Sequence, residues 1–102
     1  MTIKVQIGIS ERDICDIEPN WVNQQINGRK KEGVPVCVRV SISQGDINFT
    51  LATTDCPAGG GGGGGRPLNR QEKEIYALWK KLQLHQQSFS GGNLVAFLKQ
   101  IK

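Results

Sequence analysis

The sequence predicts an α+β domain in which a three-stranded, mostly antiparallel sheet carries helices packed on one face. Three stretches alternate apolar with polar residues, which is the pattern of strands that bury one face. Two C-terminal stretches repeat apolar residues at helical spacing instead. The 102 residues, of which 37% are hydrophobic, suffice for one small domain, 1–102. Its elements are expected in the order strand, helix, strand, strand, helix, helix.

The first strand is expected at Ile3–Ile9, where an aliphatic residue fills every second position. The segment Ser10–Asp13 resembles a helical capping box, and apolar residues at helical spacing follow it. Pro19 forces a fresh start, and proline suits the first turn of a helix because its missing N–H group costs nothing there. We therefore predict a helix from Pro19 to about Lys30, ended by a glycine.

Two further alternating stretches, Val34–Ile42 and Ile47–Thr53, predict the second and third strands. A two-residue loop at Gln44 and Gly45 joins them as a hairpin, and with this loop every apolar residue falls on one face. Whether the first strand lies beside the second or the third is left open by the sequence. The predicted cross-strand pairs are Ile42 with Ile47, Val40 with Phe49 and Val38 with Leu51.

Residues 55–67 contain seven consecutive glycines, Gly59–Gly65. Glycine has no side chain to bury and loses the most conformational entropy when it is ordered, so we expect a flexible loop that acts as a spacer. A phosphate-binding loop is the alternative, since backbone N–H groups ahead of a helix bind anions and Arg66 and Arg70 flank the run. Phosphate loops place glycines at set positions before Lys-Ser or Lys-Thr, which favours the spacer.

The C-terminal part predicts two helices. Asn69 and Glu72 form a capping box, and apolar residues then follow at positions i, i+3, i+4 and i+7. This pattern predicts an amphipathic helix that runs to about Leu84. After an interruption at residues 91–93, the same spacing recurs from Leu94 and predicts a last helix that reaches the C-terminus.

Basic residues are concentrated in this C-terminal part. Residues 1–65 carry six Lys and Arg against seven Asp and Glu, residues 66–102 carry seven against two, and the net charge is +4. A basic helix face is usually only solvated, but this asymmetry makes a polyanionic partner an alternative. Four basic residues of the first C-terminal helix are expected opposite its apolar stripe, namely Arg70, Lys73, Lys80 and Lys81.

Aromatic residues bear on this alternative, because many proteins that bind nucleic acid stack bases on exposed rings. Only Tyr76 is expected to be exposed among the basic positions. Trp79 lies at the edge of the apolar stripe, so we expect a core residue with part of its ring left exposed for a partner. The candidate partner- or anion-binding residues are Arg66, Arg70, Lys73, Tyr76, Trp79, Lys80 and Lys81.

The three cysteines, at positions 15, 37 and 56, are odd in number and about twenty residues apart. A secreted disulfide framework is not expected from this spacing, and reduced thiols in a cytosol are the simpler interpretation. Cys56 and His85 would supply a thiol nucleophile and a base, and the three cysteines with His85 would supply a zinc site. No residue is placed to orient the imidazole and no C-x-x-C pair is present. We therefore expect no catalytic residue, no metal and no cofactor.

By elimination, the sequence predicts a small cytoplasmic, non-enzymatic module that binds another protein. The alternative is a basic accessory protein that binds nucleic acid through the C-terminal helical region. No apolar run approaches the roughly 20 residues that a membrane span needs, and residues 1–9 do not resemble a secretory signal. A membrane is therefore not expected among the partners, and the oligomeric state is left open.

Overall fold

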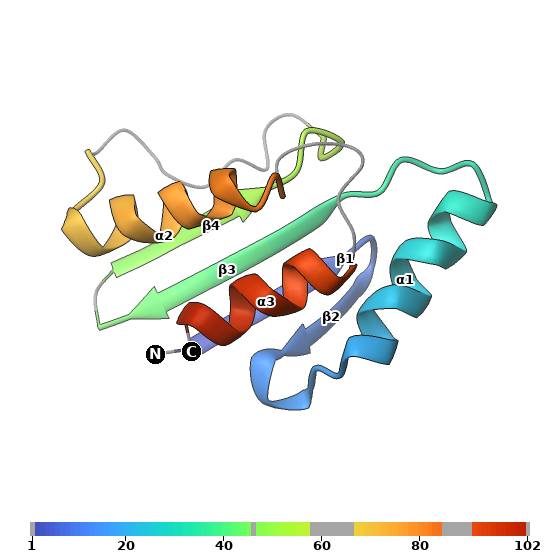
Figure 1. Ribbon diagram of the computed structural model, residues 1–102, viewed down its shortest axis with the longest axis horizontal. Helices are drawn as coiled ribbons and strands as arrows, with labels where there is room; N and C mark the ends of the chain where they lie inside the picture. Colours follow the sequence, from blue (N-terminus) through green and yellow to red (C-terminus); the bar gives the residue numbers. More distant parts are fainter. Residues whose placement is uncertain (1, 46, 58–66, 85–90, 102) are drawn as a thin grey trace.

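A computed structural model describes residues 2–45, 47–57, 67–84 and 91–101 (Figure 1). The strands form one sheet in the order β2-β1-β3-β4, and all neighbouring strands are antiparallel. Helices cover one face of this sheet (Figure 1), so the predicted α+β class is confirmed. The elements are β1 (Thr2–Ile7), β2 (Ser10–Asp13), the 3-10 helix η1 (Ile14–Asp16), α1 (Pro19–Lys31), β3 (Val38–Gln44), β4 (Ile47–Ala52), α2 (Arg70–Lys81) and α3 (Gly91–Ile101).

The sheet has four strands where the sequence analysis expected three. The added strand is β2, the segment that resembles a capping box. It shows no apolar alternation because it lies at the edge of the sheet and buries none of its side chains fully. Gly8 makes the turn before it, with a φ of +63°. Asp13 caps η1 instead of a long helix, since its Oδ1 accepts a 3.1 Å hydrogen bond from the Cys15 N–H.

The loop between β3 and β4 begins at Gly45 rather than at Gln44, so the predicted pairing is wrong by two residues. The difference places Gly45, with a φ of +58°, at the first loop position, where tight hairpins need a positive φ. Because side chains alternate with a period of two, the apolar set stays on the predicted face. The observed pairs include Gln44 with Ile47, Ile42 with Phe49 and Val40 with Leu51.

The hydrophobic core lies between the sheet and the helices. Each of β1, β3 and β4 alternates buried with less buried residues, as predicted. Arg12 of β2 covers the edge of this core, because its Cζ lies 5.0 Å from the ring centroid of Trp21. The largest contributions to the core come from Ile3, Val5, Ile7, Val38, Val40, Ile42, Phe49, Leu51, Trp21, Val22, Ile26, Ile75, Trp79, Leu84, Leu94, Phe97 and Leu98.

The helix boundaries follow the sequence closely at α1 and at the start of α2. The capping box before α2 is confirmed: the Glu72 N–H donates to Asn69 Oδ1 at 2.8 Å, and the Asn69 N–H donates to Glu72 Oε1 at 3.1 Å. Helix α2 ends at Lys81, earlier than predicted, and α3 begins at Gly91 rather than at Leu94. Within the described residues, no helix is both long enough and apolar enough to cross a membrane.

Three predictions fall partly or wholly on residues that the structure does not describe. The glycine run lies within residues 58–66, which are outside the described ranges. The same holds for Arg66 and His85. The spacer, the phosphate-loop alternative and any role of Arg66 therefore stay predictions.

Candidate interaction surfaces

The first candidate surface is the exposed face of α2, which we call the α2 basic face and define by Arg70, Lys73, Tyr76, Lys80 and Lys81. All five residues are exposed, as the sequence predicts. Arg70 Nε lies 3.7 Å from Glu74 Oε1, in a pair whose side chains are 95% and 70% exposed. Such an exposed pair is solvent-screened and contributes little to stability.

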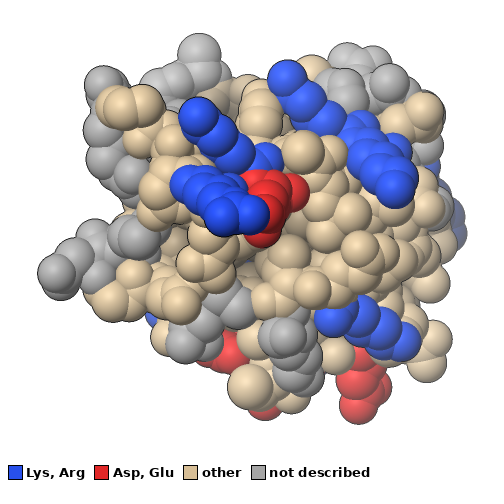
Figure 2. Space-filling model, turned by 60° about the vertical axis from the view of Figure 1, so that its left-hand side comes forward, with Lys and Arg blue, Asp and Glu red and all other residues tan. Residues whose placement is uncertain are grey.

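The ring of Tyr76 is not freely available on this face. Its residue is 38% exposed, but Lys80 Nζ lies 4.7 Å from the ring centroid and covers part of it. Figure 2 shows Lys and Arg side chains in separate groups with uncharged surface between them, and acidic side chains beside some of these groups. The described residues on the face shown there therefore do not form the continuous basic groove that follows a phosphate backbone.

Trp79 belongs to the core and not to this surface. It is 2% exposed, and its ring packs edge to face against Phe97. The expectation that part of the ring stays available to a partner is wrong. The reason is that α3 covers the edge of the apolar stripe, through a helix contact that a single-helix pattern does not reveal.

The cysteines differ most from expectation. Cys37 and Cys56 form a disulfide, with Cα atoms 4.5 Å apart, while Cys15 is free and exposed. The expectation of three reduced thiols is therefore wrong, because strand pairing brings two residues together that are 19 positions apart in sequence. The bond also leaves no thiol at Cys56 for the nucleophile or zinc alternatives. The described residues contain no group of three or more His, Cys, Asp and Glu side chains able to hold a metal ion.

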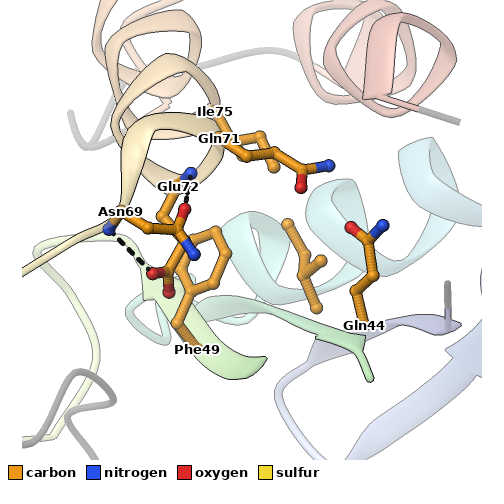
Figure 3. Close-up of a pocket in the computed structure, with 7 residues that line it drawn as sticks. Gln44, Phe49, Asn69, Gln71, Glu72 and Ile75 are labelled. Atoms are coloured by element: carbon orange, nitrogen blue, oxygen red, sulfur yellow. Dashed lines mark hydrogen bonds between the residues drawn. The ribbon is translucent and has the colours of Figure 1, made fainter. Parts of the chain in front are cut away.

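A small cavity lies at the start of α2, between this helix and the ends of β3 and β4 (Figure 3). Its volume of about 10 Å³ leaves space for about one water molecule. Glu72 lies beside it, 1% exposed. In Figure 3 one dashed line joins the Glu72 carboxylate to the Asn69 N–H, and the other joins the Glu72 N–H to the side-chain oxygen of Asn69. The polar groups here serve the helix cap, so this cavity is a structural feature.

A larger depression lies at the opposite end of the sheet from this cavity. We call it the arginine pocket, and its volume of about 490 Å³ falls in the roughly 300–1,000 Å³ range of ligand pockets. The turn between β1 and β2 and the connection from α1 to β3 meet there, at the right-hand end of the sheet in Figure 1. Its lining residues are Gln6, Gly8, Arg29, Pro35, Cys37, Arg39, Asp55 and Pro57.

Hydrogen bonds and the disulfide fix the backbone around the arginine pocket. The Gly8 N–H donates to the Cys37 carbonyl at 3.0 Å, which joins the β1–β2 turn to the start of β3. Thr53, 4% exposed, joins the end of β4 to the same segment. Its Oγ1 accepts from the Val38 N–H and donates to the Val36 carbonyl, each at 3.2 Å. The pocket is therefore built on backbone that is tied at three points.

Arg29 reaches the pocket from the last turns of α1. Its guanidinium lies directly against Gly8, in the space that a Cβ at residue 8 would fill. The Nε atom is buried without a hydrogen-bond partner, and no described residue forms a hydrogen bond or ion pair with the side chain. A half-buried guanidinium without a carboxylate partner is uncommon, because a desolvated charge is costly unless it is paired.

The other charged groups of the pocket are Arg39 and Asp55. Arg39 Nη2 donates to the Pro57 carbonyl at 3.5 Å, so this guanidinium is held toward the segment after β4. Asp55 forms no ion pair with either arginine among the described residues. Two guanidinium groups against one carboxylate leave the pocket with a net positive charge.

Two exposed aliphatic residues, Ile9 and Val34, are chain neighbours of the lining residues Gly8 and Pro35, and we call them the apolar rim. Ile9 is 93% exposed and follows Gly8; Val34 is 42% exposed, and its N–H donates to the Arg29 carbonyl at 3.0 Å. The alternating pattern placed both on the buried face of strands, which is wrong. Strand β1 ends at Ile7 and β3 begins only at Val38.

The sequence pattern does not point to the arginine pocket, because the candidate residues that it indicates all lie in the C-terminal part of the chain. The available signal was Gly8, which interrupts the first alternating stretch and thereby suggests a turn. Comparison with protein-family models, with curated proteins and with solved structures finds no match for this chain.

Proposed function

We propose that this protein is a small non-enzymatic module that binds another protein through the arginine pocket and the apolar rim. The observation that carries the proposal is the 93% exposure of Ile9 beside a pocket that holds two arginines. A single exposed aliphatic residue is ordinary. Here Ile9 and Val34 flank a half-buried arginine, and the core of a protein interface combines such apolar and arginine side chains.

The backbone of the surface supports the same proposal. The disulfide and the Thr53 hydrogen bonds tie the segment 36–38 to the segment 53–56. The bond from the Gly8 N–H to the Cys37 carbonyl ties the β1–β2 turn to the first of these segments. A surface that is ordered before binding loses little conformational entropy when a partner binds. The non-enzymatic part of the proposal is supported by the disulfide at Cys56, since a thiolate is the nucleophilic form of cysteine.

The proposal is tested in two stages. The tagged protein is recovered from its native cells with and without nuclease, and each protein that persists after nuclease is purified. Its dissociation constant is then measured by calorimetry against the native chain and the double variant Ile9→Ser/Val34→Ser. We expect at least about tenfold weaker binding by the variant, the effect of truncating interface hot spots. Both residues are exposed, so an unchanged melting temperature is the fold control.

The second candidate is a nucleic-acid-binding accessory protein that uses the α2 basic face. It is favoured by the exposure of Lys73, Lys80 and Lys81. The matched variant is Lys80→Glu/Lys81→Glu, measured by fluorescence anisotropy with single- and double-stranded oligonucleotides at several salt concentrations. Tight oligonucleotide binding that this variant abolishes, together with no effect of the rim variant on any recovered protein, would replace the main proposal with this one.

The cytoplasmic location stays a prediction. The odd number of cysteines suggests reduced thiols and therefore a cytosol. Disulfides are rare in a reducing cytosol, so the bond between Cys37 and Cys56 does not support that location. Thiol labelling in intact cells tests the location. Reduced Cys37 and Cys56 would agree with the cytoplasm, and an oxidised pair would favour an oxidising compartment.

A further inference from the structure

We infer that the arginine pocket binds a carboxylate group, supplied by an Asp or Glu side chain of the partner protein next to an apolar residue. This inference rests on the proposed function and names the chemistry of the partner. Its starting point is Arg29, the half-buried guanidinium that no described residue pairs. Native structures leave few buried polar groups unsatisfied, and a bound acceptor is one explanation of such a group.

The geometry leaves the outer part of this guanidinium available. Nε is buried without a partner, whereas neither Nη atom is among the buried unpaired atoms of the described residues, so the Nη atoms of this lining residue are accessible to a ligand. The guanidinium lies on the backbone of Gly8, which has no Cβ to displace it. A planar fork held in one place binds a carboxylate through two parallel N–H···O bonds, which a lysine ammonium does not do.

The charges of the pocket favour a carboxylate over a phosphate. Arg29 and Arg39 supply two positive charges, and Asp55 removes one. The Asp55 carboxylate repels any bound anion, and it repels a doubly charged phosphate more strongly than a singly charged carboxylate, so a carboxylate is favoured. One N–H of the Gln6 amide donates to the Gly8 carbonyl at 3.0 Å, which holds this amide against the β1–β2 turn.

The apolar rim indicates a protein source for this carboxylate. Ile9 and Val34 are exposed beside the pocket, and Pro35 lines it. A free small carboxylate would leave these side chains in water. An acidic residue with an aliphatic neighbour would pair with Arg29 and cover the rim at the same time, which adds buried apolar area to the ion pair.

The experiment uses nuclear magnetic resonance of the ¹⁵N-labelled protein, with the Arg29 Nε–Hε signal identified by its loss in Arg29→Lys. The probes are the blocked tripeptide acetyl-Leu-Glu-Leu-amide, its neutral counterpart acetyl-Leu-Gln-Leu-amide, sodium acetate and inorganic phosphate. We expect the Glu peptide to shift the Arg29 and Gly8 signals saturably at millimolar concentration, the weak end of the affinity scale. The Gln peptide, acetate and phosphate should each bind at least about tenfold more weakly.

Variants test the assignment to Arg29. Arg29→Lys keeps the charge and loses the fork, so we expect at least about tenfold weaker binding of the Glu peptide. Lys99→Gln removes one charge from the exposed part of α3 and should leave binding within about twofold, which controls for net charge. An unchanged backbone spectrum away from the pocket shows that both variants fold.

The outcomes separate this inference from the proposed function. Equal shifts by the Glu and Gln peptides, or none with any probe, would overturn the carboxylate assignment. Equal binding of acetate or phosphate would assign the pocket to a free anion. If a partner protein binds and Arg29→Lys leaves its affinity unchanged, the inference fails while the proposed function stands. If the Glu peptide binds as expected and no partner protein survives purification, the proposed function fails while the pocket chemistry stands.

Discussion

The rings of Trp79 and Phe97 meet edge to face, with centroids 5.2 Å apart and planes inclined at 74°. This contact joins α2 to α3, and the two residues are 2% and 0% exposed. Trp79→Ala removes a large buried ring and its aromatic contact, so we expect the free energy of unfolding to fall by about 3–5 kcal/mol. Urea denaturation followed by circular dichroism measures it.

The matched control for Trp79 is Tyr76→Ala on the same helix. Tyr76 is 38% exposed, so its replacement should lower the free energy of unfolding by less than about 1 kcal/mol. Similar losses for the two variants would contradict the core position of Trp79.

The disulfide between Cys37 and Cys56 is expected to stabilise the fold by restricting the unfolded chain. It closes a loop with a sequence separation of 19, for which the chain-entropy estimate is about 3 kcal/mol. Cys37→Ser/Cys56→Ser should lose about this amount in urea denaturation. Cys15→Ser, at the exposed free cysteine, should change the stability by less than about 0.5 kcal/mol. A native melting curve that does not respond to a reductant would contradict the prediction.

The elements that the sequence predicts well are those with local signals. The helix α2 has both halves of its capping box, Asn69 and Glu72, within four residues of each other. The core faces of β1, β3 and β4 follow from alternation alone. The predicted register of the β3–β4 hairpin is wrong by two residues. A shift of two residues keeps each side chain on the same face, so the alternation of apolar residues does not distinguish the two registers.

The features that the sequence does not predict depend on contacts between distant segments. Strand β2 is held by its pairing with β1 and has no apolar pattern of its own. Cys37 and Cys56 meet only because β3 pairs with β4. The arginine pocket combines Arg29 of α1 with the Gly8 turn and with Arg39 of β3. No spacing along the chain predicts that these three segments meet. The uneven distribution of charge indicates the basic C-terminal residues as candidates instead.

Gln83 is the described non-glycine residue with a positive φ, 59°. It follows α2 in the position that usually holds glycine: the Gln83 N–H donates to the Lys80 carbonyl at 2.9 Å, and the Leu84 N–H donates to the Trp79 carbonyl at 3.2 Å. A side chain in this left-handed conformation costs about 1 kcal/mol. Gln83→Gly should therefore raise the free energy of unfolding by up to about 1 kcal/mol, and Gln83→Ala should not raise it, in the same urea assay.

Substitutions at Gly28 and Gly33 separate the two costs that a substitution at Gly8 combines: the cost of a left-handed backbone and the cost of displacing Arg29. Gly28 has no left-handed φ and nothing near its missing Cβ, so Gly28→Ala in α1 should stabilise the protein by about 0.5–1 kcal/mol. Gly33 has a φ of +74° and equally open space. Gly33→Ala should therefore destabilise by about 1 kcal/mol, which measures the cost of the left-handed backbone alone.

Gly8→Ala combines both effects, since Gly8 has a φ of +63° and the Arg29 guanidinium occupies the position of the new Cβ. That guanidinium ends a flexible side chain, so it should swing away while the backbone stays in place. The loss of stability should then exceed that of Gly33→Ala by less than about 1 kcal/mol, whereas the Arg29 Nε–Hε signal should move and binding of the Glu tripeptide should weaken. Unchanged peptide binding by Gly8→Ala would show that the Arg29 guanidinium binds the peptide without its contact to Gly8. A much larger loss of stability would show that contacts other than the one with Gly8 fix Arg29.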